Sequence, residues 1–503
     1  MKTLEQVYLE TILESKTTFA PFDEALKNPL FEKGIRLPKK LEEIGGPDSE
    51  ALIVGGAVRD LVLGKEISDI DIATNISIEE IEKHFKTDEI GANKTFGIVN
   101  VHFEGDQFEV AHYRTETTYS DGRHPDKVEL TNTFEGDSAR RDFSWNALGI
   151  NSMGEIIDYH NGLEDLKNKI VRAVGNPHER FKEDSLRILR LIRFAVKMGF
   201  EIEENTLNAA KELINLTDSL SKERVAEEIY KVAGISGKTL AEYFIKLDEI
   251  GLLEKILPEL YNLKPMQHNL KHHPEGGGTV LGHVLEALKM SRSNDALTNL
   301  AIAFHDLGKA TTYKYREEKG HTYYGHEEAG VPIIKEIGKR LKLSNKDIDV
   351  ISYCAANHMR IHKIYELSRG KLVSMVNHPF WPYLKEVGYA DEMCRGFEHS
   401  QDADFKKKIE YAENIAKEAN AGGGPDELKK RIKTLINGQL LLEWIPELNK
   451  TENKIYIGKI LSKIHEWIID NNLFNLSQEE IKKKALEVFT QETTNSFKKF
   501  ISN

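Results

Sequence analysis

One stretch near the start of the chain, Leu52–Thr74, combines glycines and carboxylates in a pattern suited to phosphate chemistry. Within Leu52–Thr74 an apolar run leads into Gly55 and Gly56, and further on Asp69 and Asp71 alternate with isoleucines. Strand side chains point to opposite faces in turn, so both carboxylates are expected on one face. Adjacent carboxylates repel unless a cation lies between them, and glycines let backbone N–H groups approach phosphate oxygens. The pattern predicts metal-dependent chemistry on a nucleoside triphosphate.

A third carboxylate is expected beside this pair. Two alternating runs, Thr95–Phe103 and Gln107–Tyr113, are separated by a turn and predict a hairpin. In the second run Glu109 lies on the face opposite its apolar neighbours. An isolated pair of aspartates also suits a solvated edge strand, but the preceding glycines and Arg59 favour a metal site built from Asp69, Asp71 and Glu109.

A later segment, Glu183–Arg193, combines acidic and basic residues with an apolar helix face. Arg187, Arg190 and Arg193 recur at steps of three, which places them on one flank of a helix. The plainest interpretation is an amphipathic helix with an ion pair between Asp184 and Arg187. Cytosine and adenine each present an amino donor beside a ring-nitrogen acceptor, so a carboxylate and a guanidinium together would select these two bases.

Composition indicates a large soluble protein of several domains. The chain has 503 residues, a formal charge of −12, 40% hydrophobic residues and two cysteines. No segment is long and apolar enough to span a membrane, and the first residues lack an apolar leader. The low cysteine count argues against a disulfide framework, so we expect a cytoplasmic protein. The acidic balance disfavours indiscriminate nucleic-acid binding and leaves room for a local basic groove.

The stretch GGAVRD, the paired aspartates and the later RRDFSWNA together resemble the class II tRNA nucleotidyltransferase and bacterial poly(A) polymerase family. The resemblance runs from about residue 50 to at least 235. It implies a nucleotidyltransferase palm followed by helical neck, body and tail. The family usually has Thr-Ile where this chain has Ser144-Trp145, a change expected in the buried half of the motif. The resemblance assigns nucleotide contacts to Gly56, Arg59, Arg141, Asp142, Asp184 and Arg187, with Arg190 and Arg193 nearby, and Mg²⁺ binding to Asp69 and Asp71. Gly55, the other member of the glycine pair, is a further candidate for nucleotide binding.

The segment Ser221–Glu228 reads as a capped helix and also resembles the neck motif that braces the family's base-selecting helix.

A separate series of histidines and aspartates follows in the second half of the chain. The pair His305-Asp306 follows an apolar run, which predicts a buried helix ending at Gly308. Imidazole and carboxylate ligands suit Ni, Mn, Co, Fe or Mg ions. The series resembles an HD-type metal-dependent phosphohydrolase domain, and we expect a second divalent metal site at His283, His305, Asp306, His326, His358 and Asp391. His272, His273, His321 and His399 are expected to be ordinary structural or exposed histidines.

We therefore expect an α+β chain that begins with a small mixed sheet and continues as helices. The expected parts are a helical N-terminal extension (1–48), the palm (49–176), a helical neck that binds RNA and nucleotide (177–264), an HD domain (265–400) and a helical tail (401–503). Glu116–Asp126 is expected to be a polar loop, and Gly422–Gly424 a break between helices.

The resemblance implies an enzyme that adds C, C and A to the 3′ end of tRNA from CTP and ATP and releases pyrophosphate. The HD domain would be a phosphohydrolase acting on 2′,3′-cyclic or 2′-phosphates. Poly(A) addition, and addition of only CC or only A, remain alternatives because the palm and neck motifs do not separate these activities. A protein acting mainly as an HD phosphohydrolase is a further alternative. The sequence indicates no protein partner and no membrane association.

Overall fold

The structure is a computed structural model that describes residues 2–3, 25–88, 97–117, 127–268, 276–395, 400–420, 424–450, 453–471, 473–474 and 476–501. The chain divides into two compact units, which we describe separately. Unit 1 comprises Met1–Val232 and Glu242–Leu257, and unit 2 comprises Ala233–Ala241 and Pro258–Asn503. The finer division at residues 48, 176, 264 and 400 stays a prediction. Within the described ranges, no helix combines the length and apolar character needed to cross a membrane.

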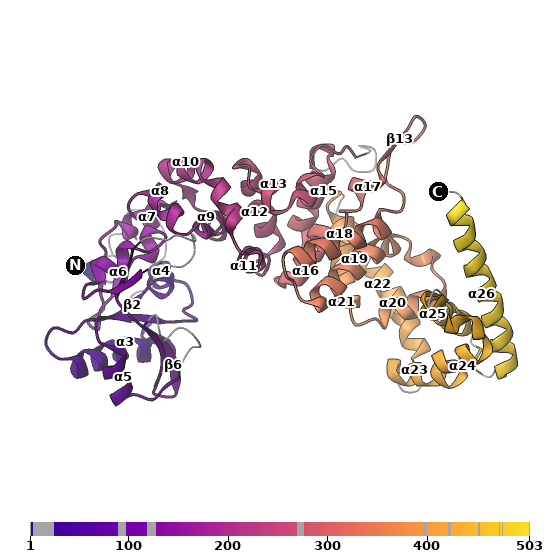
Figure 1. Ribbon diagram of the computed structural model, residues 1–503, viewed down its shortest axis with the longest axis horizontal. Coiled ribbons are helices and arrows are strands. Elements are labelled where there is room, and N and C mark those ends of the chain that lie inside the picture. The colour runs from indigo at the N-terminus through magenta and orange to yellow at the C-terminus, as the bar shows by residue number, and fades with distance from the viewer. Residues whose placement is uncertain are drawn as a thin grey trace. The chain divides into compact units, whose positions relative to one another are not determined.

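A mixed sheet of eight strands underlies the first part of unit 1, as Figure 1 shows in indigo and purple. Its strand order is β1-β10-β9-β2-β3-β6-β5-β4. The strands are β1 (Lys2–Thr3), β2 (Ala51–Val54), β3 (Asp71–Thr74), β4 (Thr87–Asp88), β5 (Ile98–Phe103), β6 (Asp106–His112), β9 (Gly149–Ile150) and β10 (Glu155–Ile157). In this sheet β3 and β6 run parallel, whereas the other neighbours are antiparallel. The expected hairpin is confirmed as β5–β6, with its turn at Glu104 and Gly105.

One of the helices that flank this sheet begins at its expected capping residue. In α5 (Ile78–His84) the Ser77 side chain accepts a hydrogen bond from the Glu80 N–H, which confirms the predicted cap. Helix α4 (Gly56–Val62) follows β2 through Gly55, whose φ of 69° is a conformation that a side chain would strain. Helix α3 (Pro29–Gly45) lies in the expected N-terminal extension, but Lys2–Thr3 pair with β10. The extension is therefore not purely helical.

The prediction of a polar loop at Glu116–Asp126 is wrong for its first residues. Strand β7 (Arg114–Thr117) includes Glu116 and pairs antiparallel with β8 (Lys127–Leu130). Residues 118–126 lie outside the described part of the chain.

Short helices and strands follow the sheet, and the later ones include residues 233–241, which belong to unit 2. They are α6 (Phe134–Ala139), a 3₁₀ turn (Ser144–Asn146), α7 (Gly162–Asn168), β11 (Ile170–Val171), α8 (Pro177–Glu183), α9 (Leu186–Met198), β12 (Glu201–Ile202), α10 (Glu204–Glu212), a 3₁₀ helix (Ile214–Ser219), α11 (Lys222–Ala233), α12 (Gly237–Glu249) and α13 (Leu253–Ile256). Trp145 is fully buried, as expected for its half of the motif, and its ring meets Phe143 and Phe194. Its indole N–H donates to the Ile170 carbonyl, so this large residue is accommodated with its polar atom satisfied.

Unit 2 is almost entirely helical, as predicted. Its helices are α14 (Pro258–Tyr261), α15 (Val280–Met290), α16 (Ala296–Phe304), α17 (Lys309–Thr312), α18 (His326–Arg340), α19 (Asn345–His362), α20 (Arg369–Val376), α21 (Trp381–Met393), α22 (Ser400–Ala419), α23 (Gly424–Leu435), α24 (Gly438–Trp444), α25 (Ile455–Asp470) and α26 (Gln478–Ile501), with 3₁₀ turns at Gly276–Gly278, Ile364–Glu366 and Pro446–Asn449. The exception is a hairpin of β13 (Lys314–Arg316) and β14 (Gly320–Thr322), which the sequence pattern did not predict.

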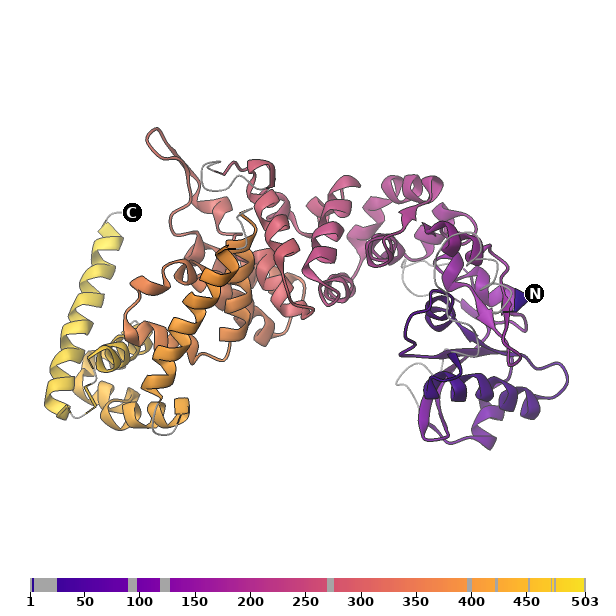
Figure 2. The same cartoon turned by 180° about the vertical axis from the view of Figure 1, so that it is seen from behind.

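The last helices of unit 2 have a core of their own. Buried isoleucines of α25 pack against Ile481, Ala485 and Val488 of α26, and Figure 2 shows these two helices in yellow from behind. The chain passes from α22 to α23 at the expected glycine-rich break, where residues 421–423 lie outside the described part.

Candidate active sites

The three predicted carboxylates of unit 1 are brought together by the β3–β6 pair. Asp71 is the first residue of β3, and its register partner across the parallel pair is Glu109. Asp69 precedes the strand, but Ile70 and Ile72 are buried while both aspartates are exposed, so the predicted alternation holds. The carboxylates therefore come from adjacent strands and lie on the side of β3 opposite its buried isoleucines.

The pKa values of Asp71 and Glu109 are raised within this group. Partial burial, followed by the charges of Asp69 and Glu109, raises the pKa of Asp71 from 3.8 to about 6, although Arg141 opposes the shift. The pKa of Glu109 is also raised, first by burial and then by Asp69. A cluster of acids with raised pKa values has too little positive charge around it, which is the electrostatic condition for holding a cation.

One cavity of about 500 Å³ in unit 1 connects Asp71 and Glu109 with the base-selecting residues expected from the sequence. Its wall includes Gly55, Gly56, Arg59, Asp71, Glu109, Arg141, Asp142, Asp184, Arg187 and Arg190. Most of the site residues expected in the first half of the chain thus share one space. Asp69 and Arg193 are not among the described residues that form its wall; Arg193 is buried against Glu228.

The arginines that border this cavity are held by carboxylates. Arg59 is 6% exposed and donates to Asp60 and, at 3.0 Å, to Asn146 Oδ1. Arg141 is tethered at 3.0 Å by Asp137, a residue 1% exposed that also binds Arg140. These guanidinium groups are therefore fixed in place before any ligand arrives, which lowers the entropic cost of binding phosphate.

Asp142 is fixed as an ionised carboxylate by Arg190. Arg190 donates from Nε at 2.8 Å and from Nη2 at 2.5 Å to Asp142 Oδ2, and Asn146 Nδ2 donates to Oδ1 at 3.0 Å. Burial alone would raise the pKa of Asp142, but Arg190 and Asn146 lower it to about 2. This link joins the RRDFSWNA segment to α9, 48 residues later in the chain.

The expected ion pair between Asp184 and Arg187 does not form, and each side chain has another partner. Arg224 of α11 donates to both carboxylate oxygens of Asp184, at 3.2 and 2.7 Å. Arg187 donates to Glu183 Oε2 at 2.6 Å and to the carbonyls of Arg180 and Arg140. Asp184 caps the end of α8 with an extended backbone, so the carboxylate is directed away from Arg187 by the break between α8 and α9. Both side chains still border the same cavity.

Three contributors to this site were missed as site residues. Asp137 precedes Arg140 and Arg141 by three and four residues on α6, a spacing that could have been read from the sequence. Asn146 belongs to the RRDFSWNA motif, but the motif alone did not predict its contacts with Arg59 and Asp142. Arg224 lies in the helix predicted from Ser221, but its contact with Asp184 spans 40 residues and needed the fold.

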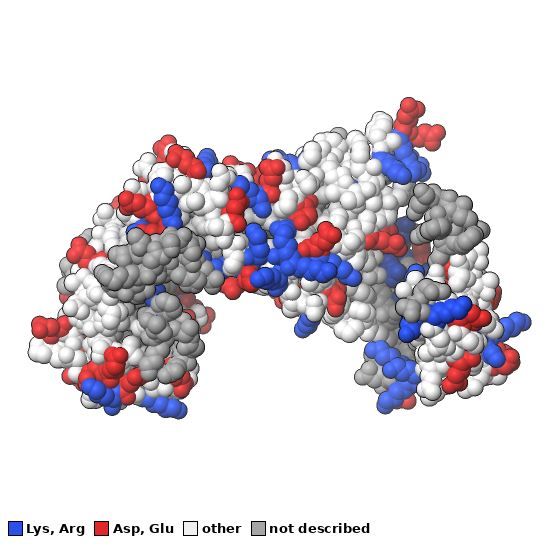
Figure 3. Space-filling view, viewed as in Figure 1, with Lys and Arg blue, Asp and Glu red and all other residues white. Residues whose placement is uncertain are grey.

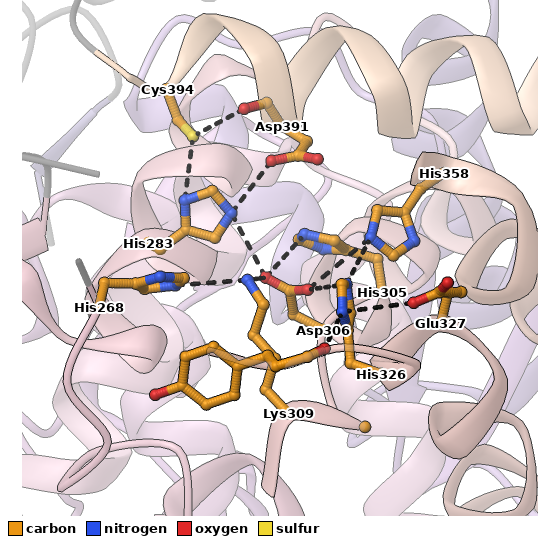
Figure 4. A network of polar contacts seen from close by, with 12 residues as sticks. His268, His283, His305, Asp306, Lys309, His326, Glu327, His358, Asp391 and Cys394 are labelled. Atoms are coloured by element: carbon orange, nitrogen blue, oxygen red, sulfur yellow. Dashed lines mark hydrogen bonds and ion pairs between the residues drawn. The ribbon is translucent and has the colours of Figure 1, made fainter. Parts of the chain in front are cut away.

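In unit 2 the six expected metal ligands converge from four helices and one loop (Figure 4). The helix before His305 ends at Phe304 rather than at the expected Gly308, and residues 305–308 form turns between α16 and α17. A Cβ at Gly308 would lie 1.9 Å from the His326 carbonyl, so only glycine allows this loop to approach α18 so closely. That close approach brings His326 to the His305-Asp306 pair.

The ligand atoms surround Asp306. His326 Nε2 lies 3.3 Å from Asp306 Oδ1, and His305 Nε2 lies 3.3 Å from Oδ2. His283 Nε2 lies 3.5 Å from Asp306 Oδ2 and 3.1 Å from Asp391 Oδ1, and His326 Nε2 lies 3.2 Å from His358 Nε2. All six residues are buried, and their ligand atoms form overlapping groups of three within 4.8 Å.

Backbone carbonyls orient three of these histidines toward the centre. The Nδ1 atoms of His305, His326 and His358 lie 2.7, 2.8 and 2.7 Å from the carbonyls of Ile302, Tyr323 and Ala355. This fixes Nδ1 as the protonated nitrogen and leaves Nε2 free to ligate, the usual arrangement of metal-binding histidines. His305 Nε2 and Asp306 Oδ1 are buried and lack a hydrogen-bond partner among the described residues. The donor set thus fits a divalent cation.

Neighbouring residues adjust the charge of this cluster. Burial, then His305, lowers the pKa of His358 well below its usual value, so that imidazole stays neutral and able to ligate. Lys309 Nζ lies 2.5 Å from Asp306, and His362 Nε2 lies 2.6 Å from Asp391 Oδ2. Lys309 and His362 were not anticipated here. The expected ordinary histidine His321 lies in the β13–β14 hairpin, and His272, His273 and His399 lie outside the described residues.

Three family models match successive parts of the chain. Residues 51–172 match the "Poly A polymerase head domain", residues 199–263 match the "Probable RNA and SrmB- binding site of polymerase A", and residues 271–396 match the "HD domain".

Curated relatives match part of the chain. A CCA-adding enzyme from Enterococcus faecalis is 48% identical over 193 residues, 38% of this chain and 47% of that enzyme. A CCA-adding enzyme from Ligilactobacillus salivarius is 42% identical over 237 residues, 47% of this chain and 55% of that enzyme. The chain thus spans about half the length of the curated relatives it matches.

Solved structures share the fold over most of the chain. The CCA-adding enzyme of Bacillus stearothermophilus in complex with CTP has a TM-score of 0.64 at 23% identity, covering 93% of this chain and 100% of that one. A tRNA nucleotidyltransferase complexed with a primer tRNA and an incoming ATP analogue has a TM-score of 0.51 at 21% identity, covering 76% of this chain and 99% of that one. Along the chain, the successive segments are thus similar to a poly A polymerase head domain, to the polymerase A segment and to an HD domain, in that order.

Proposed function

We propose that this chain is a CCA-adding tRNA nucleotidyltransferase. The observation that carries the proposal is that a single cavity contains the Asp71–Glu109 carboxylates at one part of its wall and Asp184 and Arg187 at another. A triphosphate held beside the carboxylates would place its base within reach of the second group. The relatives from Enterococcus and Ligilactobacillus are named CCA-adding enzymes, which supports addition of the CCA sequence.

Asp69 and Asp71 would hold Mg²⁺, with Glu109 adjacent. The raised pKa values of Asp71 and Glu109 fit such a role, because the cluster repels itself without a cation. When bound, Mg²⁺ supplies activation of the attacking hydroxyl and neutralises charge on the leaving pyrophosphate. The 3′ hydroxyl of tRNA would attack the α-phosphate, with Gly55, Gly56 and Arg141 against the phosphates.

Base choice would come from Asp184 and Arg187. The carboxylate of Asp184 would accept from the exocyclic amino group of C or A, and Arg187 would donate to the ring nitrogen. Both side chains must exchange existing partners, Arg224 and Glu183, for the base. Uracil and guanine present the opposite pattern at this edge and would leave the two charged groups unsatisfied. Arg190 would act indirectly, through Asp142.

The test is extension of tRNAs that end at the discriminator base, at C, or at CC, with CTP and ATP supplied singly and together. A product that stops at CCA supports the proposal. A long A tail would identify a poly(A) polymerase, and arrest after CC or addition of A alone would identify a partial enzyme.

The two cysteines are both free and buried, which supports a reducing, cytoplasmic location.

We infer a second activity, hydrolysis of phosphoesters at the HD cluster, because six buried ligands converge there. His283, His305, Asp306, His326, His358 and Asp391 would hold one or two divalent ions, which supply an activated water when bound. The water oxygen would bond to phosphorus, one ester P–O bond would break, and the leaving alkoxide would take a proton. Lys309, beside Asp306, is placed to neutralise a phosphate oxygen.

The two activities are separable by mutation of the full chain. His305→Ala should remove hydrolysis of a 2′,3′-cyclic phosphate and lower the bound transition-metal content, with nucleotide addition retained. Asp69→Asn should remove nucleotide addition and retain hydrolysis of the 2′,3′-cyclic phosphate. If neither elemental analysis nor metal addition reveals a bound ion in the wild type, the HD assignment is wrong.

A further inference from the structure

The β13–β14 hairpin carries an unusual set of side chains beside the HD cluster. Its register pairs Tyr315 with His321 and Lys314 with Thr322. Because strand side chains alternate, Tyr315 and His321 share one face while Lys314 and Arg316 lie on the other. In Figure 1 the hairpin projects from the helices of its own unit. One face of this projection is thus aromatic and the other is basic.

The rings on the aromatic face continue inward as an unbroken series. The ring centroids are 5.4 Å apart for Tyr315 and His321, 5.7 Å for His321 and Tyr313, and 5.7 Å for Tyr313 and Tyr323. Tyr323 then lies 5.8 Å from His268, which is 5.2 Å from the metal-ligand candidate His283. We call Tyr315, His321, Tyr313, Tyr323 and His268 the ring series. It leads from solvent to the cluster.

Much of this aromatic surface is open to water. Tyr315 is 63% exposed, Tyr313 is 45% exposed, and Tyr324, next to the series, is 64% exposed. Exposed rings of this size forgo the stabilisation that burial would provide, roughly 1.5–3 kcal/mol for a large apolar side chain. Several such rings on one short hairpin mark a binding surface rather than a packing element.

Basic groups accompany the rings. The Arg316 guanidinium lies 5.2 Å and the Lys319 ammonium 6.0 Å from the centre of the Tyr324 ring. Lys309 Nζ lies 5.8 Å from the centre of the Tyr323 ring. Glu317 and Glu318 occupy the turn, and Figure 3 shows acidic and basic side chains together on the projecting hairpin. Arg316 and Lys319 therefore flank Tyr324 on the basic face, Lys309 flanks Tyr323 of the ring series, and Glu318 and Glu327 also border the adjoining cavity.

One cavity joins the inner edge of the hairpin to the metal-ligand candidates. It has a volume of about 900 Å³ and is bordered by residues 318–327 together with His268, Asp306, Lys309, His358 and Asp391. Ligand pockets span roughly 300–1,000 Å³, so the cavity has room for a substrate much larger than a phosphate. A phosphoester at the cluster would extend along β14 toward the exposed tyrosines.

We propose that the ring series and its neighbouring cations bind the bases and phosphates of single-stranded RNA, so that the HD cluster acts on the terminal phosphate of an RNA strand. Every base has an aromatic face, so tyrosines bind single strands without sequence preference while lysines and arginines contact the backbone. An apolar peptide would not require the cations, and a small sugar phosphate would not reach Tyr315. The proposal rests on the hydrolytic activity proposed for this cluster.

The decisive comparison uses two substrates with the same reacting group. An RNA tetranucleotide ending in a 2′,3′-cyclic phosphate carries bases, whereas glycerol 1,2-cyclic phosphate has the same five-membered diester without a base. Loss of one stacked base costs about tenfold or more in affinity. Tyr315→Leu should raise KM for the tetranucleotide by about tenfold and leave glycerol cyclic phosphate unchanged, because Tyr315 is not among the described residues that border the cavity of the metal-ligand candidates. Equal effects on both substrates, or none on either, would overturn the proposal.

Two further variants test the ring itself. Tyr315→Phe keeps the aromatic face and should retain the wild-type KM. Tyr365→Leu removes a tyrosine of similar exposure, 58%, from a different part of unit 2 and should also leave KM unchanged. A loss in Tyr315→Phe equal to that in Tyr315→Leu would show that stacking is not the cause.

A binding measurement separates this proposal from the hydrolytic one. Amide hydrogen exchange over residues 313–324 of the full chain is measured with and without a uridine hexanucleotide. Protection in the wild type that is lost in Tyr315→Leu supports the RNA surface, even if neither cyclic phosphate is hydrolysed and the hydrolytic activity is absent. If the wild-type hairpin gains no protection, the RNA surface is wrong whether or not hydrolysis occurs.

Discussion

The ion pair between Arg193 and Glu228 should be essential for the stability of unit 1. Arg193 of α9 donates from Nε to Glu228 Oε2 of α11 at 2.5 Å, and the two residues are 7% and 1% exposed. Helix α11 also carries Arg224, the partner of Asp184. Replacing Arg193 with Met keeps much of the side-chain volume but leaves a buried carboxylate without its main partner.

The expected cost follows from the groups left behind. Removing one partner of a buried pair typically destabilises a protein by about 3–5 kcal/mol, because the remaining charge stays desolvated. Lys231 Nζ, 3.3 Å from Glu228 Oε1, would still offer a second cation. We therefore expect Arg193→Met to lower the free energy of unfolding by about 3 kcal/mol, at the lower end of that range. The double variant Arg193→Met with Glu228→Leu removes both charges and should lose no more than about 1 kcal/mol.

Urea unfolding of the full chain can follow unit 1 alone. Trp145 meets Phe194, the residue after Arg193, so its fluorescence reports on this region once Trp381, Trp444 and Trp467 are replaced by Phe. A loss of about 3 kcal/mol in the free energy of unfolding should lower the urea concentration at the unfolding midpoint by about 1 M. A double variant as unstable as the sum of the two single variants would refute the reasoning, since it would mean that the helices lost packing rather than charge balance.

Three further predictions concern the two sites. The pKa of Asp71 is raised from 3.8 to about 6, so its stabilising contribution is present below pH about 4 and lost as the pH rises through about 6. Above this pH window, Asp71→Asn should raise the free energy of unfolding of the metal-free protein by about 1 kcal/mol, a value reduced for solvent screening. The same variant should lose most of the stabilisation that Mg²⁺ gives the wild type. Equal Mg²⁺ effects in the variant and the wild type would contradict this prediction. Asp184→Ala should raise UTP incorporation relative to CTP more than it slows CTP addition, as measured with each triphosphate alone, and an unchanged preference would rule out base selection by this carboxylate. Removal of metal by a chelator should lower the melting temperature of unit 2, followed through Trp381 on the helix of Asp391, by several degrees in a way that added Mn²⁺ reverses; a chelator-independent transition would argue against a bound ion.

Local patterns in the sequence predicted the strands, helices and turns that carry the first site. Alternation placed the paired aspartates on the face opposite buried isoleucines, and the second alternating run positioned Glu109 as strand β6. These predictions succeeded because side-chain direction in a strand depends only on residue number. The end of the helix before His305 was misplaced, since an apolar run does not show where a loop must turn to meet α18. The β13–β14 hairpin was missed because polar residues flank its tyrosines.

Residue types at their spacings were enough to indicate two kinds of chemistry, triphosphate transfer near the N-terminus and metal-dependent hydrolysis further on. Tertiary structure alone decided the partners. Arg224 reaches Asp184 across 40 residues, Arg190 reaches Asp142 across 48, and His283 reaches Asp391 between helices α15 and α21. Sequence spacing governs contacts within one helix or strand pair, whereas ion pairs between elements depend on how those elements pack. The expected Asp184–Arg187 pair failed for that reason: the backbone turns between α8 and α9, and a residue from α11 supplies the charge.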